Sequence, residues 1–218
     1  MTSDHSGQND PGTPEEISRR TFMAGATVVL GGIVGLGVAI PAITSLFPTK
    51  DIIAGSKSWS PLDADEMGQL AASTDKPIKI FFTQDVHDGY LEAQNSDYVW
   101  GIKLKPADMD KLKSTRPDLP DLQVVAEGIS PYPVVTMGFV MFSSICPHLG
   151  CRYNWDDGSN KFMCPCHGSE YSIFGEHLAG PAPRGLDPLP LQEKSGAAQI
   201  TWIRYKQGEP TRIVVSYT

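Results

Sequence analysis

All four cysteines of the chain lie in two short segments, and each segment also carries a histidine. In the first metal loop, Cys146–Cys151, the histidine is His148. In the second metal loop, Cys164–Ser169, it is His167. Thiolates and imidazoles are ligands of zinc and of iron–sulfur clusters. Because a disulfide framework usually spreads its cysteines to close long loops, this crowding predicts a metal site.

Two facing loops of this kind supply two sulfurs and two nitrogens, which tetrahedral zinc could use. The alternative is a 2Fe–2S cluster in which two cysteines bind one iron and two histidines bind the other. Two further cysteines, Cys151 and Cys166, remain, and a disulfide between them would tie the loops together in an exported protein. Glycines and prolines let the loop amides turn toward sulfur, and Ser169 and Tyr171 offer hydroxyl donors. These features favour the cluster over zinc.

The two loops resemble the paired motifs of the Rieske proteins of cytochrome bc- and bf-type quinol oxidases. Tyr171 stands where that family has a tyrosine that tunes the cluster's potential. Gly180–Pro183, with the sequence Gly-Pro-Ala-Pro, resembles the proline loop that packs over the cluster. The resemblance is strong over residues 136–192 and weak over residues 60–130.

The resemblance implies a role for each matching residue. It makes Cys146 and Cys164 the ligands of the buried iron, and His148 and His167 the ligands of the outer iron. It also implies a disulfide between the two remaining cysteines. The residues that it places in the disulfide and around the cluster are Cys151, Cys166, Leu149, Ser169, Tyr171, Gly180 and Pro181.

The resemblance further implies the Rieske electron-transfer subunit of a respiratory or photosynthetic quinol:cytochrome c oxidoreductase, not catalytic alone. In that role His148 and His167 face the quinol, and one electron and a proton leave it together. The expected partners are cytochrome b, a c-type cytochrome and membrane quinol, in a dimeric multi-subunit complex. The alternative is the Rieske small subunit of an exported molybdenum oxidase such as arsenite oxidase, where we expect phenylalanine in place of Tyr171.

The sequence gives conflicting indications of which quinone the protein would oxidise. Ser169 and Tyr171 favour a high potential, compatible with ubiquinol or plastoquinol. The stretch Arg152–Trp155 (Arg-Tyr-Asn-Trp) and Arg184 after the proline loop look more like Gram-positive and related menaquinol-type proteins. The remaining histidines, among them His177, are expected at the surface rather than as ligands.

A membrane anchor is expected near the N-terminus, because Thr21–Thr49 carries no charged residue. At about 1.5 Å per residue such a helix exceeds a hydrocarbon core of about 30 Å. Just before it, Ser18–Met23 (Ser-Arg-Arg-Thr-Phe-Met) resembles the twin-arginine signal, which exports proteins already folded with their cofactor. No convincing cleavage site follows, so we expect one retained span. The N-terminus would lie in the cytoplasm, with the head outside a bacterial cytoplasmic membrane.

The rest of the chain predicts a mainly β, Rieske-type antiparallel head with inserted metal loops. Glycine and proline are plentiful, at 21 and 18 residues, and the net charge of -7 makes nucleic acid an improbable partner. One short helix is expected over 60–72, with Ser60–Pro61 at its start. A second is expected over 106–114. Strands are expected over 79–83, 98–104, 134–142, 199–205 and 211–217. Turns are expected over 85–89 and 156–160. The expected parts are a disordered tail (1–20), an anchor (21–47), a flexible hinge (48–57) and the head (58–218).

Overall fold

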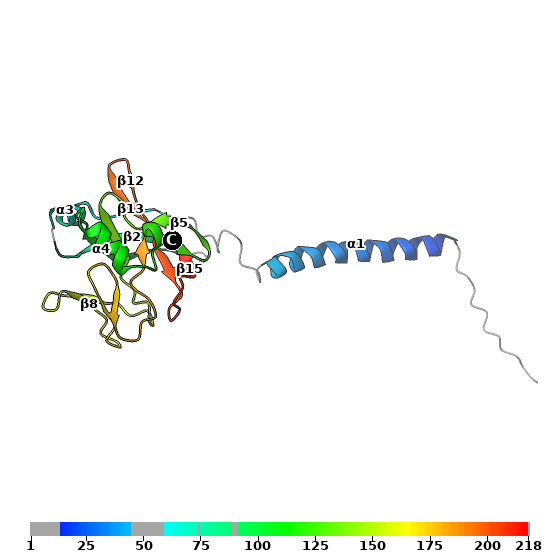
Figure 1. The fold of residues 1–218 in the computed structure, drawn as a ribbon. Coiled ribbons are helices and arrows are strands. Elements are labelled where there is room, and N and C mark those ends of the chain that lie inside the picture. Colours follow the sequence, from blue (N-terminus) through cyan, green and yellow to red (C-terminus); the bar gives the residue numbers. More distant parts are fainter. Residues whose placement is uncertain (1–13, 45–58, 74, 89–90, 218) are drawn as a thin grey trace, which may run out of the picture. The chain divides into compact units, whose positions relative to one another are not determined.

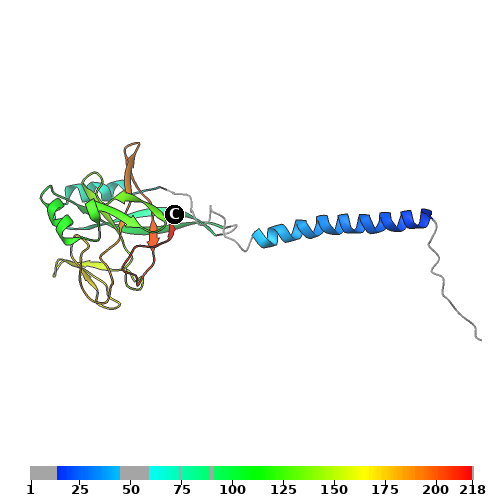
Figure 2. The ribbon, with the colours of Figure 1, turned by 45° about the vertical axis from the view of Figure 1, so that its right-hand side comes forward.

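The computed structural model describes residues 14–44, 59–73, 75–88 and 91–217. The chain divides into two units, Met1–Thr49 and Lys50–Thr218, and each is described by itself (Figures 1 and 2).

The first unit contains the long helix α1, Pro14–Thr44. Its stretch Ser18–Ile43 is long and apolar enough to cross a membrane, and none of it is buried within the protein. Proline at the first helical position and acidic residues in the first turn suit a helix start. Residues 14–20 are therefore helical, which corrects the expectation of a disordered tail up to residue 20. The expected hinge, 48–57, lies outside the described residues.

The head is built mainly from antiparallel strands, which confirms the predicted fold class. Its largest sheet has the strand order β11-β6-β3-β2. The hairpin β2–β3 pairs from Ile78↔Gly101 to Asp88↔Leu91, so residues 85–88 continue the strand where a turn was expected. The strands of this sheet are β2 (Ile78–Asp88), β3 (Leu91–Lys103), β6 (Phe139–Ser143) and β11 (Pro188–Leu189).

A second sheet, with the order β10-β9-β8-β7, is an insertion into the first. Strands β6 and β11 pair directly, Phe142 with Pro188, although the whole second sheet lies between them in the sequence. The first metal loop leads from β6 to β7, and the second connects β8 to β9. In both views the region around β8 lies on the opposite side of the head from the β12–β13 hairpin (Figures 1 and 2). The strands are β7 (Asn154–Asp156), β8 (Lys161–Met163), β9 (Glu170–Tyr171) and β10 (His177–Ala179).

Three small sheets complete the head, with orders β1-β13-β12, β14-β15 and β4-β5. Two expected strands are interrupted. In the expected strand 134–142, a turn with positive φ at Met137 and Gly138 comes first, and β6 begins only at Phe139. In the expected strand 199–205, residues 201–202 separate β13 from β14. The strands are β1 (Ser60–Pro61), β4 (Gln123–Ala126), β5 (Ile129–Pro133), β12 (Leu191–Lys194), β13 (Ala197–Ile200), β14 (Ile203–Tyr205) and β15 (Val214–Tyr217).

Short helices cover part of the head. Helix α3 (Ala64–Ala72) is capped by Asp63, whose carboxylate accepts two backbone N–H bonds, so Ser60 is not its cap but part of β1. Its Leu70 packs closely over Gly101 of β3, where a Cβ would come within 2.7 Å of the leucine side chain. Helix α4 (Asp108–Thr115) and the 3₁₀ turn Pro120–Leu122 precede β4.

An aromatic cluster joins the two large sheets. Phe162 of β8 is fully buried, and its ring centroid lies 5.4 Å from that of Trp100 on β3. Tyr153 and Trp155 contact the same ring at 5.3 and 5.0 Å. Such pairs contribute about 0.5–1.5 kcal/mol each beyond the area that they bury. The cluster therefore fixes the inserted sheet, and with it both metal loops, against the rest of the head.

Three arginines and two aspartates form a largely buried ionic network in the head. Asp118 accepts hydrogen bonds from Arg116 and Arg212 at 2.8 and 2.6 Å. Asp187 accepts from Arg184 and from Arg212. Because a buried guanidinium stays charged, each arginine needs its carboxylate partners. The network ties three segments that are distant in the sequence to one another.

Asp118 provides a test of this network. Burial by itself raises the pKa of Asp118, but hydrogen bonds and charges from Arg116 and Arg212 outweigh it and hold the pKa well below 3.8. Asp118→Asn is expected to lower the free energy of unfolding at neutral pH by about 2 kcal/mol. The side chain is 33% exposed, which keeps the effect below that of a fully buried partner.

The difference in unfolding free energy between wild type and Asp118→Asn should shrink as the pH falls below about 4, because the stability from a carboxylate with a depressed pKa is lost there. Urea unfolding at several pH values measures it. Asp157→Asn, at an exposed ion pair with Lys76, is the control and should leave the midpoint unchanged at neutral pH. A difference that stays constant down to about pH 2 would contradict the role of the Asp118 charge.

Candidate metal centre

The two metal loops have the same backbone turn. In the first, the Cys146 N–H donates to the Cys151 carbonyl at 2.8 Å, and the Gly150 N–H donates back to the Cys146 carbonyl at 3.1 Å. The second loop repeats both bonds at the equivalent positions, at 2.9 and 3.0 Å. The fifth residue is glycine in both loops, Gly150 and Gly168, with φ of 84° and 72°. Only glycine adopts this conformation without strain, which explains its place in both motifs.

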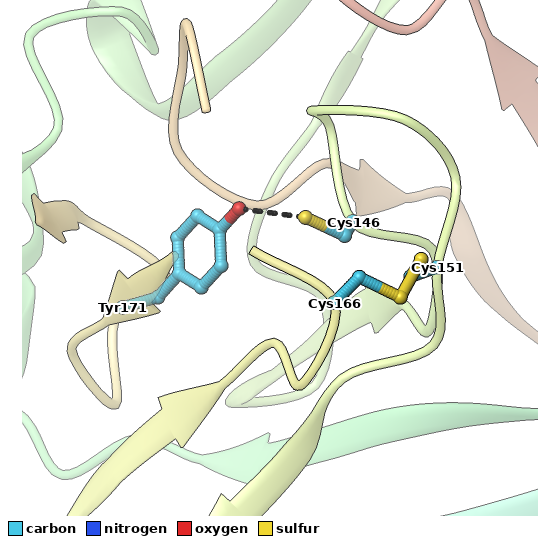
Figure 3. Close-up of a disulfide and its surroundings, with 4 residues drawn as sticks. All are labelled: Cys146, Cys151, Cys166 and Tyr171. Carbon is cyan, nitrogen blue, oxygen red and sulfur yellow. Dashed lines mark hydrogen bonds between the residues drawn. A yellow bond between two sulfur atoms is a disulfide. The ribbon is translucent and has the colours of Figure 1, made fainter. Parts of the chain in front are cut away.

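The structure brings the two loops together. Cys151 and Cys166 form a disulfide between them (Figure 3). Cys146 and Cys164 are free, buried thiols that interact with each other. The sulfurs of Cys151, Cys164 and Cys166 lie within 4.8 Å of one another, but two of them belong to the disulfide, so Cys164 is the free thiol of that group.

The two histidines also meet. The ring centroids of His148 and His167 are 4.8 Å apart, and the rings are perpendicular. Within the described residues, Nδ1 of His148 is buried and has no hydrogen-bond partner. A buried nitrogen without a partner is costly unless a ligand satisfies it. Two free thiols and two facing imidazoles, one with an unsatisfied buried nitrogen, fit the donor set of a cysteine–histidine 2Fe–2S cluster.

Each loop is exposed on one side only. His167 is exposed and His148 is half-buried, while Cys146 and Cys164 lie inside. Leu149 projects outward with 63% of its surface exposed, so it borders the histidines at the surface. The imidazoles are thus on the solvent side and the free thiols on the inner side.

Tyr171 contacts the inner thiol of the first loop. Its hydroxyl lies 3.1 Å from the sulfur of Cys146 (Figure 3). Burial raises the pKa of Tyr171 far above 10.0, and the contact with Cys146 raises it further, so the hydroxyl stays protonated and can donate to sulfur. Burial also raises the pKa of the Cys146 thiol above 9.0, although the hydrogen bonds from Tyr171 and from the His148 N–H lower it in part. A metal that binds here must displace that proton.

Ser169 and the proline loop close the second metal loop from the other side. The buried hydroxyl oxygen of Ser169 accepts the N–H of Ala182 at 3.2 Å. Gly180, with φ of 90°, lies so close that a Cβ would be 2.5 Å from Cα of Ser169. Pro181, by contrast, is exposed. The predicted contact of the proline loop with the site is therefore made through Gly180 and Ala182.

Relatives of the chain agree with this geometry. The family model of the Rieske [2Fe-2S] domain matches residues 118–190. The cytochrome b6-f complex iron-sulfur subunit of Parasynechococcus marenigrum (strain WH8102) is 30% identical over 175 residues, covering 78% of this chain and 76% of that relative. The subunit of the same name from Prochlorococcus marinus (strain MIT 9515) is 31% identical over 173 residues, with the same two shares. The chain belongs to the Rieske iron–sulfur protein family.

The cofactor of this Rieske domain is the 2Fe–2S cluster. This chain is also similar to a chain in a solved structure of a hyperthermophilic respiratory Complex III. The two are 18% identical with a TM-score of 0.36, and the match covers 80% of this chain and 98% of that one. The family assignment rests on the sequence relatives.

Some residues at the site escaped the sequence analysis. Tyr153 packs on Tyr171 with ring centroids 5.9 Å apart, and its hydroxyl donates to the Ser143 carbonyl at 2.5 Å. Its position two residues after the first loop was the only signal. His177, expected at the surface, is half-buried, since β10 pairs it with Tyr171 and its ring lies 5.8 Å from the tyrosine ring.

Tyr171→Phe is expected to keep the cluster but lower its midpoint potential, because a hydroxyl donor to sulfur stabilises the reduced, more negative form. Redox titration followed by electron paramagnetic resonance (EPR) measures the shift. Tyr153→Phe is the matched control, because it removes an adjacent buried hydroxyl that contacts a carbonyl instead of sulfur. Equal shifts in both variants would contradict the role of the contact between Tyr171 and Cys146.

Proposed function

We propose that the chain is the Rieske subunit of a quinol:cytochrome c oxidoreductase, in which Cys146, Cys164, His148 and His167 bind the cluster. The observation that carries the proposal is the pair of disulfide-linked loops that place two free thiols inside and two facing imidazoles at the surface. The similarity to cytochrome b6-f complex iron-sulfur subunits supports the quinol-oxidising branch.

The bound cluster supplies a one-electron acceptor, whose potential is raised because neutral imidazoles replace two thiolates. The chain's own residues handle the proton and the docking. The exposed His167 presents its outer ring nitrogen to the quinol hydroxyl and takes its proton, and His148 stands beside it. Leu149 offers an exposed apolar contact next to both rings. The electron then passes to a c-type cytochrome, and the proton is released outside the membrane.

The partners and the location are part of the same proposal. Helix α1 anchors the chain in a bacterial cytoplasmic membrane by a single span, with Arg19 and Arg20 on the cytoplasmic side. The head then reaches the quinol pocket of a cytochrome b on the outer side, and residues 48–57 serve as its hinge. A dimeric complex with a c-type cytochrome is the assembly expected for such a subunit.

The quinone of the proposal is one of high potential, ubiquinol or plastoquinol. The hydroxyl groups of Ser169 and Tyr171 both lie at the site, and that of Tyr171 contacts the sulfur of Cys146. Arg152 and Arg184, which favoured menaquinol in the sequence, form ion pairs with Asp97 and Asp187. These arginines have structural partners, and the proposed quinone rests on the two hydroxyls.

Replacement of the proposed histidine ligands tests the function. His148→Ala and His167→Ala should each abolish the rhombic EPR signal of the cluster and the quinol-dependent reduction of cytochrome c by membranes that carry the variant. His177→Ala, which alters a nearby histidine that is not a proposed ligand, should keep the signal. An intact EPR signal in either ligand variant would refute its assignment. Full activity of membranes that lack the chain would refute the quinol-oxidising role.

The export route is tested separately. Replacing both Arg19 and Arg20 by lysine should leave the head in the cytoplasm, because the twin-arginine pathway requires the arginine pair. The measurement is digestion of the head by a protease added to spheroplasts. The head should be cleaved in wild type and protected in the double variant. Cleavage in both would exclude this signal.

A further inference from the structure

A turn near the C-terminus lies against the first metal loop. This turn, Lys206–Glu209, follows β14 and connects it to the segment before β15. The Gly208 N–H donates to the Pro147 carbonyl at 2.9 Å. The Gln207 side chain passes 3.8 Å from the place where Gly150 would carry a Cβ. The turn therefore contacts the loop on both sides of its exposed tip.

One guanidinium holds both ends of this turn. Nη1 of Arg184 donates to the Lys206 carbonyl at 3.1 Å and to the Glu209 carbonyl at 2.5 Å. The remaining nitrogens of the guanidinium, Nε and Nη2, donate to the two carboxylate oxygens of Asp187 at 2.9 and 2.7 Å. The side chain is only 2% exposed, so water does not compete for these bonds. Arg184 thus connects the end of the proline loop to the turn.

The turn acts on a single peptide unit of the metal loop. The carbonyl of Pro147 and the N–H of His148 belong to one planar peptide group. The carbonyl accepts from Gly208, and the N–H is directed at the sulfur of Cys146. Because the group is rigid, a contact that fixes its oxygen also fixes its N–H and the Cα of His148.

We propose that Arg184 is a positioning residue for His148 and acts through the turn Lys206–Glu209. This inference rests on the proposed ligand role of His148. The guanidinium holds the turn, and the turn holds the peptide group between Pro147 and His148. The position of this peptide group fixes where the His148 side chain begins and where its N–H points relative to Cys146. Loss of the Nη1 contacts loosens that peptide and weakens the donor to sulfur, which lowers the cluster's potential.

Arg184→Lys tests the inference, because lysine keeps the charge beside Asp187 but cannot reproduce the planar fork. Arg116→Lys is the matched control. Arg116 belongs to the same buried network and is 1% exposed, but it donates to the carbonyls of Phe174 and Leu186 instead of the turn. The measurements are the midpoint potential of the cluster-loaded protein and the hydrogen exchange of the Gly208 amide.

Arg184→Lys should lower the potential and speed the exchange of the Gly208 amide. Arg116→Lys should change neither, although it also destabilises the fold. Semisynthesis that replaces the Gly208 amide by an ester removes the N–H donor, keeps the positive φ of residue 208 and leaves the network in place, and it should lower the potential as well. Arg184→Lys should add no further shift in that background. This variant carries the test if Arg184→Lys does not fold.

Equal shifts from Arg184→Lys and Arg116→Lys would overturn the inference. An additional shift of full size from Arg184→Lys in the protein with an ester at Gly208 would overturn it as well. An unchanged potential in a folded, cluster-loaded Arg184→Lys protein would do the same. The ligand role itself fails on a different result, an intact EPR signal in His148→Ala. The two failures are therefore distinguishable.

Discussion

The structure depends on holding two separate loops face to face. The donors of the site come from two segments, and neither segment alone offers more than one free thiol and one imidazole. The disulfide between Cys151 and Cys166 joins the loops at one point. The closed turn within each loop directs the side chains, and contact with the inserted sheet holds them in place. Each of these restraints limits the conformational freedom of the loops and so keeps the two thiols and the two imidazoles close together.

Buried charge supplies the support behind the loops. One network joins three segments that are distant in the sequence, through Arg116, Asp118, Arg184, Asp187 and Arg212. A buried guanidinium cannot lose its proton, so every arginine fixes the carboxylates and carbonyls around it. The proline loop and the C-terminal turn become parts of one rigid frame. A Rieske site that must keep its geometry while its charge changes benefits from such a frame.

The two histidines are not equivalent in their surroundings. His167 is exposed, whereas His148 is half-buried with the turn Lys206–Glu209 against its backbone. Leu149 adds an apolar surface beside them. His167 is therefore accessible from solvent, whereas the frame restrains His148. The hydroxyl-bearing residues Ser169 and Tyr171 lie on the inner side and are fully buried.

The sequence by itself determined the metal loops, the donor types, the mainly antiparallel head and the apolar N-terminal helix, because these follow from local spacing and composition. It placed the turns poorly: residues 85–88 extend a strand, and Met137–Gly138 form a turn that the apolar run concealed. It also placed His177 at the surface. Only the tertiary structure decided that Tyr153 packs on Tyr171 and that Arg184 reaches the turn beside His148. These contacts join residues far apart in the chain, and local patterns carry no information about such distant pairs.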